Sequence, residues 1–293
     1  MISKESFSLY DLPLIENELS KNHKTVFFQM CKYGYLEVVD FLIKNTNINV
    51  NNWEGNSYKQ SLHLAVQNEY KDLVKLLFIN PNLEVLISII DPLKLAISKN
   101  NIEIVKLLLH HKNIDVNKTS YSSFSFYDTE LNLAIRYNYI EIIKLLLKHP
   151  NIDVNNFSYK NGIDGEIEES ALIVAIKNNN DEVIKLLLNH PNIDVNKLTT
   201  IKTDKGNVEK KETALMVAIQ HNNVDAIKLL LQNKSVDVNI KLTVTQDWSW
   251  LNEETTALNM AVEKENFEII KLLLSNKNIK KVNQIKVLRG RQH

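Results

Sequence analysis

Three histidines recur at matching places in the sequence and are the first candidates for chemistry. Each stands two residues before an Asn-Ile-Asp-Val-Asn phrase, at His111, His149 and His190. Recurring imidazoles can hold a metal, but all ligands of a shared zinc ion must lie within about 2.1 Å of it. Histidines in successive helical units, which pack about 10 Å apart, do not meet that condition. We therefore expect no metal, and the place of each ring after a predicted helix favours an interaction with the helix dipole.

Other reactive groups are few. The only cysteine, Cys31, follows Met30 in an apolar segment, where a thiol is more typical of buried filling than of a nucleophile. Six glycines occur in 293 residues, and none forms a phosphate-binding loop. No serine has the surroundings of a nucleophile elbow. We therefore expect no enzyme activity and no cofactor.

The composition excludes several classes of protein. Lysine and arginine total 35, as do aspartate and glutamate, so the chain is not a globally basic nucleic-acid binder. No apolar run reaches the roughly 18–20 residues that cross a bilayer, and the N-terminus lacks the apolar core of a signal peptide. A single cysteine fits a reducing compartment. We expect an intracellular protein without membrane insertion, in the cytoplasm first and in the nucleus as the alternative.

One phrase recurs along most of the chain. It consists of an alanine, an Ile or Val, about seven mostly polar residues, and an apolar run built on Lys-Leu-Leu. The alanines are Ala65, Ala96, Ala134, Ala175, Ala218 and Ala261, and Met30 holds the same place in an earlier copy. The copies lie about 31 to 43 residues apart, a period typical of stacked units that cannot bury their apolar faces alone.

Each copy is consistent with two short helices, which the fifth copy places near Leu172–Lys177 and Glu182–Asn189. The second helix is apolar over most of its circumference, so neighbouring copies must bury it on several sides. The alanine is small because another element approaches it closely. We therefore expect Ala175→Glu to disrupt the middle of the array, whereas Lys177→Glu should be nearly silent for folding.

The residue between the two helices is glycine in the first copy and Asn or Glu in the later ones. The positions are Gly34, Glu69, Asn100, Asn138, Asn179, Asn222 and Glu265. Glycine and asparagine suit a left-handed backbone conformation. The pattern predicts a left-handed turn inside every copy.

These features together resemble the ankyrin repeat. The first helix opens as Thr-Ala-Leu-x-x-Ala at Thr213–Ala218 and Thr256–Ala261, a Leu-Leu-Leu helix follows, and Asp-Val-Asn closes the copy, as at Asp194–Asn196. The family's Thr-Pro-Leu-His opening survives only in part, as Asp91-Pro92-Leu93 and Ser61-Leu62-His63. The resemblance implies an all-α fold, an ankyrin-type α-solenoid of helix-turn-helix repeats with projecting β-hairpin or loop fingers.

The resemblance covers roughly residues 25–283 and divides the chain into three parts. An N-terminal capping segment spans residues 1–24, and a basic tail that we expect to be flexible spans 280–293. The tail is a frayed end, the trace of a longer chain, or a weak nuclear-targeting segment. The seven repeats run over about 25–57, 58–89, 90–127, 128–168, 169–211, 212–254 and 255–279.

The later copies exceed the family's length of about 33 residues, and the surplus falls in the fingers between the Asp-Val-Asn exit and the next helix. Insertions on one side of a solenoid often mark its binding side. Aromatic residues in the fingers either pack across hairpin strands and on the neighbouring finger, or serve as exposed anchors for a partner. The candidates for binding are Phe124, Phe126, Tyr127, Tyr159, Trp248 and Trp250.

The ends of the first helices offer a second candidate surface, which lines the concave face beside the fingers in an ankyrin stack. The residues there vary while the buried positions around them stay fixed. The candidates are Tyr33, Gln67, Asn68, Lys99, Arg136, Tyr137, Lys177, Asn178, Gln220, His221 and Lys264. Lys99, Arg136 and Lys177 form a basic stripe that either suits an acidic peptide or is simply solvated.

We predict a protein–protein interaction scaffold that binds another protein or a peptide through its concave face and fingers. The alternative is a nucleic-acid-associated or nuclear regulator that uses the basic tail, although the balanced charge does not favour nucleic acid. The sequence leaves the identity of the partner and the oligomeric state open.

Overall fold

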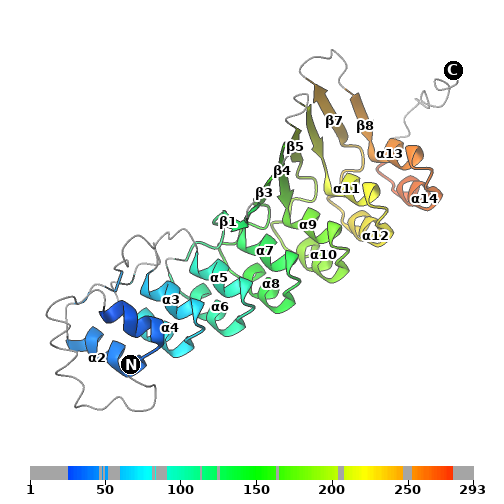
Figure 1. Cartoon of the computed structure of the whole chain (residues 1–293). Helices are drawn as coiled ribbons and strands as arrows, with labels where there is room; N and C mark the ends of the chain where they lie inside the picture. The colour runs from blue at the N-terminus through cyan, green and yellow to red at the C-terminus, as the bar shows by residue number, and fades with distance from the viewer. Residues whose placement is uncertain are drawn as a thin grey trace. The chain divides into compact units, whose positions relative to one another are not determined.

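The computed structural model describes residues 26–45, 48, 50–51, 60–80, 83, 91–112, 114–123, 126–162, 165–203, 208–246 and 253–279 (Figure 1). The predicted capping segment 1–24 and the basic tail 280–293 lie outside the described residues. The chain divides into two compact units, Met1–Ile152 and Asp153–His293.

The described part of the first unit consists of four helix pairs and one hairpin. In chain order its elements are a helix over residues 26–33, α2 (Leu36–Asn45), α3 (Ser61–Gln67), α4 (Lys71–Ile79), α5 (Pro92–Ser98), α6 (Ile102–Leu109), β1 (Ser120–Ser123), β2 (Phe126–Asp128), α7 (Glu130–Arg136) and α8 (Ile140–Leu147). The helices form two rows, because α5 packs between α3 and α7, while α4 and α6 pack between α2 and α8.

The described part of the second unit adds three helix pairs and six strands. Its elements are β3 (Phe157–Gly162), β4 (Gly165–Ser170), α9 (Ala171–Lys177), α10 (Asp181–Leu188), β5 (Thr199–Thr203), β6 (Val208–Glu212), α11 (Ala214–Gln220), α12 (Val224–Gln232), β7 (Lys241–Gln246), β8 (Glu253–Thr256), α13 (Ala257–Glu263) and α14 (Phe267–Ser275). First helices α9, α11 and α13 form one row and second helices α10, α12 and α14 form the other. The described residues thus contain seven helix pairs, as the sequence predicts.

Burial explains the recurring residues of each helix pair. In α10, Val183 and Leu187 have no exposed surface, because α9 and α12 both pack against this helix. In α9, Ala175 is also fully buried, so a larger side chain has no room there. This helix starts where predicted because the Ser170 hydroxyl caps it and accepts a hydrogen bond from the Ile173 N–H at 3.4 Å.

The turn between the two helices has the predicted left-handed conformation in every copy. The φ angle is 73° at Gly34, and it lies between 52° and 60° at the six Asn and Glu positions. A backbone hydrogen bond closes each turn onto the preceding helix, for example from the Asn180 N–H to the Ala175 carbonyl at 3.1 Å. The turn therefore ties the second helix to the anchoring alanine.

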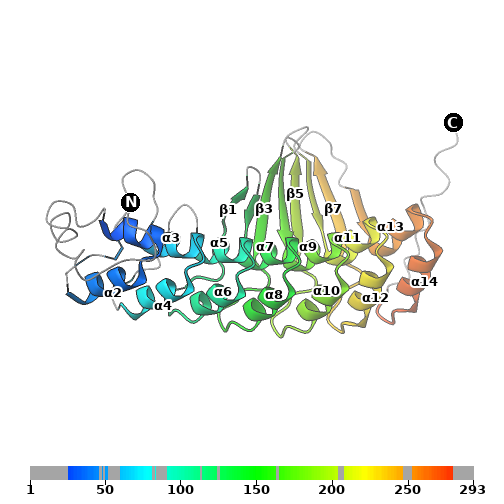
Figure 2. The same ribbon diagram turned by 60° about the horizontal axis from the view of Figure 1, so that its bottom comes forward.

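The fingers are the β-structure of an otherwise helical fold. In the second unit, six strands form an antiparallel sheet in the order β3-β4-β5-β6-β7-β8, which stands on the row of first helices (Figure 2). Each finger is a hairpin, and strands of successive fingers also pair, as at Ile167↔Ile201 and Lys210↔Val244. The lengthened fingers allow this pairing because their strands are long enough to form a ladder with the next hairpin. The fold is a solenoid of helix-turn-helix repeats with projecting hairpins, as predicted, but the all-α description is imprecise because the fingers form a β-sheet.

Asparagines of the Asp-Val-Asn exit join one repeat to the next. The Asn196 amide donates to the Ser235 carbonyl at 2.7 Å, and its oxygen accepts a hydrogen bond from the Asp237 N–H at 2.8 Å. Asn155 makes the same two contacts one repeat earlier. The repeat needs asparagine here because its side chain supplies both a donor and an acceptor.

Lys94 and Glu130 are among the charged residues buried in the first unit. Lys94 is 4% exposed and Glu130 is 0% exposed. The Lys94 ammonium donates to the Asp128 carbonyl, whereas neither carboxylate oxygen of Glu130 has a hydrogen-bond partner among the described residues. Burial raises the pKa of Glu130 well above its ordinary value and lowers the pKa of Lys94. Glu130 occupies the first position of α7, where α5 has Pro92.

Asn196→Ala should destabilise the second unit. It removes two hydrogen bonds to the backbone of the next repeat, each with a net worth of about 0.5–1.5 kcal/mol. We expect the free energy of unfolding, measured by urea denaturation, to fall by about 1–3 kcal/mol. Asn189→Ala, at an exposed helix end, is the matched control and should change it little. Equal effects of the two variants would contradict the role of the exit asparagine.

Glu130→Pro should stabilise the first unit. Unfolding lets the Glu130 carboxyl ionise, so its raised folded-state pKa lowers stability as the pH rises above the ordinary value of about 4.3. Proline suits the first position of a helix and removes the carboxyl. We expect the free energy of unfolding to rise by about 1–3 kcal/mol near pH 7 and by less near pH 4, with the exposed Glu37→Gln as a control. An equal gain at both pH values would show that proline acts only by reducing the conformational entropy of the unfolded chain, and that the carboxyl plays no part.

Candidate partner-binding surface

The first helices of the second unit end in residues of two kinds. Lys177 and Gln220 are half-buried, whereas Asn178, His221 and Lys264 are exposed. The three exposed residues are the C-cap residues of α9, α11 and α13, where the backbone N–H groups still bond to the helix. Their backbone is thus fixed while their side chains meet solvent.

Two buried carboxylates hold the half-buried residues. Lys177 Nζ lies 2.6 Å from Glu169 Oε1, and Gln220 Nε2 donates to Glu212 Oε2 at 2.7 Å. The side chains of Glu169 and Glu212 are only 7% and 4% exposed, and Lys210 also contacts Glu212. Each acid directly precedes the N-cap residue of its helix, so the contact runs from the base of a finger to the far end of that helix.

The first unit shows the same arrangement at one helix. Arg136 Nε lies 2.9 Å from Asp128 Oδ1, which belongs to a side chain that is 2% exposed. Lys99 has a different partner, because Glu69 of the preceding repeat lies 3.5 Å from its ammonium. Each cation of the predicted basic stripe, including Lys177, therefore has a carboxylate beside it. This neutralisation weakens the attraction of the stripe for an acidic peptide.

The sheet of the second unit turns one face toward the first helices, because Glu169 and Glu212 project from that face to the helix ends. Side chains alternate between the two faces along a strand. The strand register places the next row of the same face, here called the inner stripe, at Lys160, Ile167, Ile201, Lys210 and Val244. All five residues are half-buried, so the inner stripe leaves apolar surface accessible to a partner.

Some of the described finger aromatics pack against other residues, and others are exposed, as an anchor for a partner would be. Tyr159 lies on the opposite face of the sheet, where burial and the nearby Glu168 raise its pKa. Phe157 packs against Lys197, whose Nζ lies 4.3 Å from the ring centroid. Tyr127 of the first unit is 40% exposed. Phe124, Trp248, Trp250 and the side chain of Phe126 lie outside the described residues, so their role stays a prediction.

The remaining candidates belong to the first unit. Tyr33 and Tyr137 are each 51% exposed, and each ring lies beside the tyrosine two residues further on. Gln67 and Asn68 are also exposed. The Asn68 amide donates to the Lys32 carbonyl at 3.3 Å, so this side chain links two repeats and is less available to a partner than the tyrosines.

The groups considered first for chemistry have structural surroundings. Burial raises the pKa of the Cys31 thiol to about 12, so it stays protonated and unreactive. His149 and His190 each accept the backbone N–H two residues further on at 3.3 Å, so they stabilise the turn that follows the helix, and their interaction with the helix dipole stays a prediction. The described residues contain no group of three His, Cys, Asp or Glu side chains that could hold a metal ion. None of the described helices is long and apolar enough to span a membrane.

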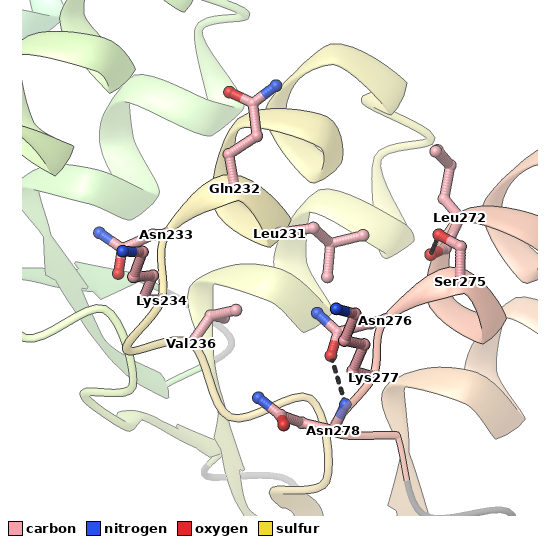
Figure 3. Close-up of a pocket in the computed structure, with 10 residues that line it drawn as sticks. All are labelled: Leu231, Gln232, Asn233, Lys234, Val236, Leu272, Ser275, Asn276, Lys277 and Asn278. Atoms are coloured by element: carbon pink, nitrogen blue, oxygen red, sulfur yellow. Dashed lines mark hydrogen bonds between the residues drawn. The ribbon is translucent and has the colours of Figure 1, made fainter.

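A depression of about 380 Å³ lies between the ends of α12 and α14, lined in part by Leu231, Val236 and Leu272 (Figure 3). Two of the residues that line it bond to each other, since the Asn278 N–H donates to the Asn276 side chain at 2.9 Å. A smaller depression of about 160 Å³ occupies the same place between α10 and α12. Because the feature recurs with the repeat, it reflects the spacing of the second helices.

Sequence reasoning missed the buried acids and the inner stripe. Asp128, Glu169 and Glu212 each stand directly before the Thr or Ser that caps a first helix. That recurring acid is visible in the sequence and could have revealed the contact with the helix end. The inner stripe depends on pairing between fingers, for which the sequence offers no comparable local signal.

Comparisons with known proteins agree on one family. The family model described as ankyrin repeats (3 copies) matches residues 8–88, 93–199, 131–242 and 197–285. The solved ankyrin repeat domain of Bcl-3, a member of the IkappaB protein family, is 20% identical with a TM-score of 0.62, and the match covers 85% of this chain and 97% of that one. An ankyrin repeat domain from Acinetobacter baumannii AYE is 24% identical (TM-score 0.52; 73% and 95% covered). The ankyrin repeat protein EF0377 is 26% identical (TM-score 0.51; 76% and 99% covered). No curated protein matches the chain significantly.

Lys177→Glu should destabilise the second unit, contrary to the expectation from the sequence. The change removes the Lys177 donor from the buried Glu169 and sets a second carboxylate against it, which typically costs about 1–3 kcal/mol. Urea denaturation should show this loss, whereas Lys177→Gln, which copies the Gln220–Glu212 pair, should lose much less. Glu169→Gln introduced together with Lys177→Glu should restore most of the stability. A Lys177→Glu variant as stable as the wild type would show that the contact contributes nothing.

Proposed function

This chain belongs to the ankyrin-repeat family, and on that premise we propose that it binds another protein or a peptide along the inner stripe and the adjacent helix ends. Ankyrin repeat domains generally mediate protein–protein interactions. The mechanism is surface complementarity on a scaffold that performs no catalysis and needs no cofactor.

The observation that carries the proposal is the inner stripe. Ile167, Ile201 and Val244 are only half-buried, although β-branched residues on a sheet face gain free energy when a partner covers them, at about 25 cal/mol per Å² of apolar surface. Lys210 interrupts this row, but Glu212 already neutralises its charge. The row therefore suits an extended segment with apolar side chains better than a strongly acidic one.

The exposed helix ends supply the polar part of the recognition. Asn178, His221 and Lys264 border the sheet at successive repeats and differ in hydrogen-bonding capacity and charge. Interfaces typically combine an apolar centre with a polar rim. In this arrangement the stripe supplies affinity, and the three helix-end residues select among partners. Tyr33, Tyr127 and Tyr137 are the matching candidates in the first unit, because each is largely exposed.

We also propose an intracellular location, which the single buried thiol of Cys31 supports because such a protein does not depend on disulfides. The alternative function, a nucleic-acid-associated regulator acting through the basic tail, concerns residues outside the described ones. Nothing in the described residues favours it.

A triple variant of the inner stripe tests the proposal. Ile167→Thr, Ile201→Thr and Val244→Thr keep β-branched side chains on the strands but remove apolar surface. The control changes three residues of the opposite face, with Glu166→Thr, Lys202→Thr and Lys211→Thr. Proteins captured by the wild-type chain and by the control, but lost with the stripe variant, are candidate partners. For such a purified partner we expect Kd, measured by calorimetry, to rise at least tenfold for the stripe variant.

The thermal melt separates binding from folding in this experiment. A stripe variant that binds weakly but melts within about 4 °C of the wild type supports the proposal. Partners that are lost with the control variant and kept by the stripe variant would contradict it, because they would place the binding surface on the other face of the sheet.

A further inference from the structure

Strand β8 ends the sheet of the second unit. It pairs with β7 along one edge, from Lys241↔Thr256 to Val244↔Glu253, and no strand among the described residues pairs with its other edge. Figures 1 and 2 show β8 at the margin of the sheet, beside α13. An unpaired edge presents a row of backbone donors and acceptors that readily take up an additional strand.

The last described repeat also lacks a following neighbour in its helical part. Val262 is 39% exposed, whereas Ile219 and Ile176 at the equivalent position of the two preceding repeats are 0% exposed. The next repeat covers this position in the earlier copies, since α11 packs between α9 and α13. The unpaired edge of β8 and the exposed Val262 therefore both belong to the side of the last described repeat that a following repeat would cover.

The chain leaves the last helix pair along the same path as in the earlier repeats. The Asn239 amide donates to the Asn278 carbonyl at 2.8 Å, which repeats the contact of Asn196 with the Ser235 carbonyl at 2.7 Å. In the earlier repeat, this exit leads directly into the next finger. The described part of the chain thus ends at residue 279, just after the exit contact that precedes the next finger in the earlier repeat.

The sequence beyond this point retains the exit motif. Val282 and Asn283 repeat the Val-Asn of Val195–Asn196 and Val238–Asn239. In both earlier copies the valine is buried, at 3% and 1% exposure. A strand then begins two or three residues after the asparagine, at Thr199 in β5 and Lys241 in β7. The same spacing after Asn283 corresponds to residues 285–289, whose sequence is Ile-Lys-Val-Leu-Arg.

We propose that residues 285–289 of this chain pair antiparallel with the outer edge of β8 and close the sheet. Two pairings between fingers fix the register. Ile167↔Ile201 and Lys210↔Val244 each join the residue three before a helix cap to the residue five after an exit asparagine. The same rule pairs Glu253 with Leu288. Leu288 then lies in the row of the inner stripe, two strands beyond Val244 and next to Glu253.

Charge favours this segment over a second copy of β8. Residues 280–293 contain five lysines and arginines and no Asp or Glu, whereas β8 carries Glu253 and Glu254, of which Glu254 contacts Lys241. Lys286 and Arg289 flank the pairing site in the proposed register. Two β8 strands from two copies would instead bring carboxylates together, and like charges on neighbouring strands are destabilising.

An engineered disulfide in the full chain tests both the pairing and its register. Residues directly opposite on antiparallel strands have Cα atoms about 4.5–5.5 Å apart, which a disulfide spans. We expect Glu253→Cys with Leu288→Cys to form a crosslink within one molecule, in most molecules under mild oxidation. Glu253→Cys with Val287→Cys is the register control, because neighbouring residues of a strand face opposite sides. The native Cys31 does not compete, since it is buried.

The outcomes of this experiment are distinct. A crosslink specific to the 253–288 pair in a monomer supports the proposal. Equal crosslinking of both pairs would show that the segment does not pair with β8 in one fixed register. A crosslink between two molecules would show that a second copy supplies the strand. Either result overturns the proposal.

Hydrogen exchange of the chain without added cysteines gives an independent test. Val287→Pro removes a backbone donor and the strand geometry of the segment. Exchange of the β8 amides, followed by mass spectrometry, should become at least tenfold faster, whereas Gln292→Pro should leave it unchanged. Identical exchange in the wild type and in Val287→Pro would overturn the proposal.

Discussion

The helices of a single repeat cannot enclose their own apolar residues. Val183 and Leu187 of α10 are completely buried only because α9 and α12 lie against them, and Ala175 must be small so that these elements can approach. The left-handed turn at Asn179 and the exit contacts of Asn196 hold the next repeat at that distance. Contact between neighbouring repeats is therefore the condition on which both the helical stack and the finger sheet depend.

Features that depend on local contacts could be predicted from the sequence. The bounds of α9 and α10 follow from apolar spacing and a Ser cap, and the turn positions follow from the preference of Gly and Asn for positive φ. The sheet could not be predicted in the same way. Its register joins Ile167 to Ile201 across an entire helix pair, and no short-range pattern in the sequence encodes a pairing at that distance.

Exposure at the ends of the first helices could be predicted from the sequence, but the side-chain contacts there could not. Asn178, His221 and Lys264 are exposed, as expected for residues at the end of the first helix of a repeat. The partner of Lys177 was missed because Glu169 belongs to the finger, and helix periodicity gives no reason to connect the two residues. Tyr159 was assigned to binding by residue type alone, and the strand register places it on the face away from the helix ends.

The buried acids show that the two residues at the end of a first helix have different roles. The two residues that follow each Ala-Ile or Ala-Val form a variable pair, and at three helices the first of them contacts a carboxylate at the base of its finger. Arg136 contacts Asp128, Lys177 contacts Glu169, and Gln220 contacts Glu212. Each of these three side chains can donate a hydrogen bond to its acid. The second residue at these helices, such as Asn178 or His221, continues the helix with its backbone N–H and has an exposed side chain. Differences between repeats at the second position can therefore reflect a partner, whereas those at the first position mainly preserve the joint between finger and helix.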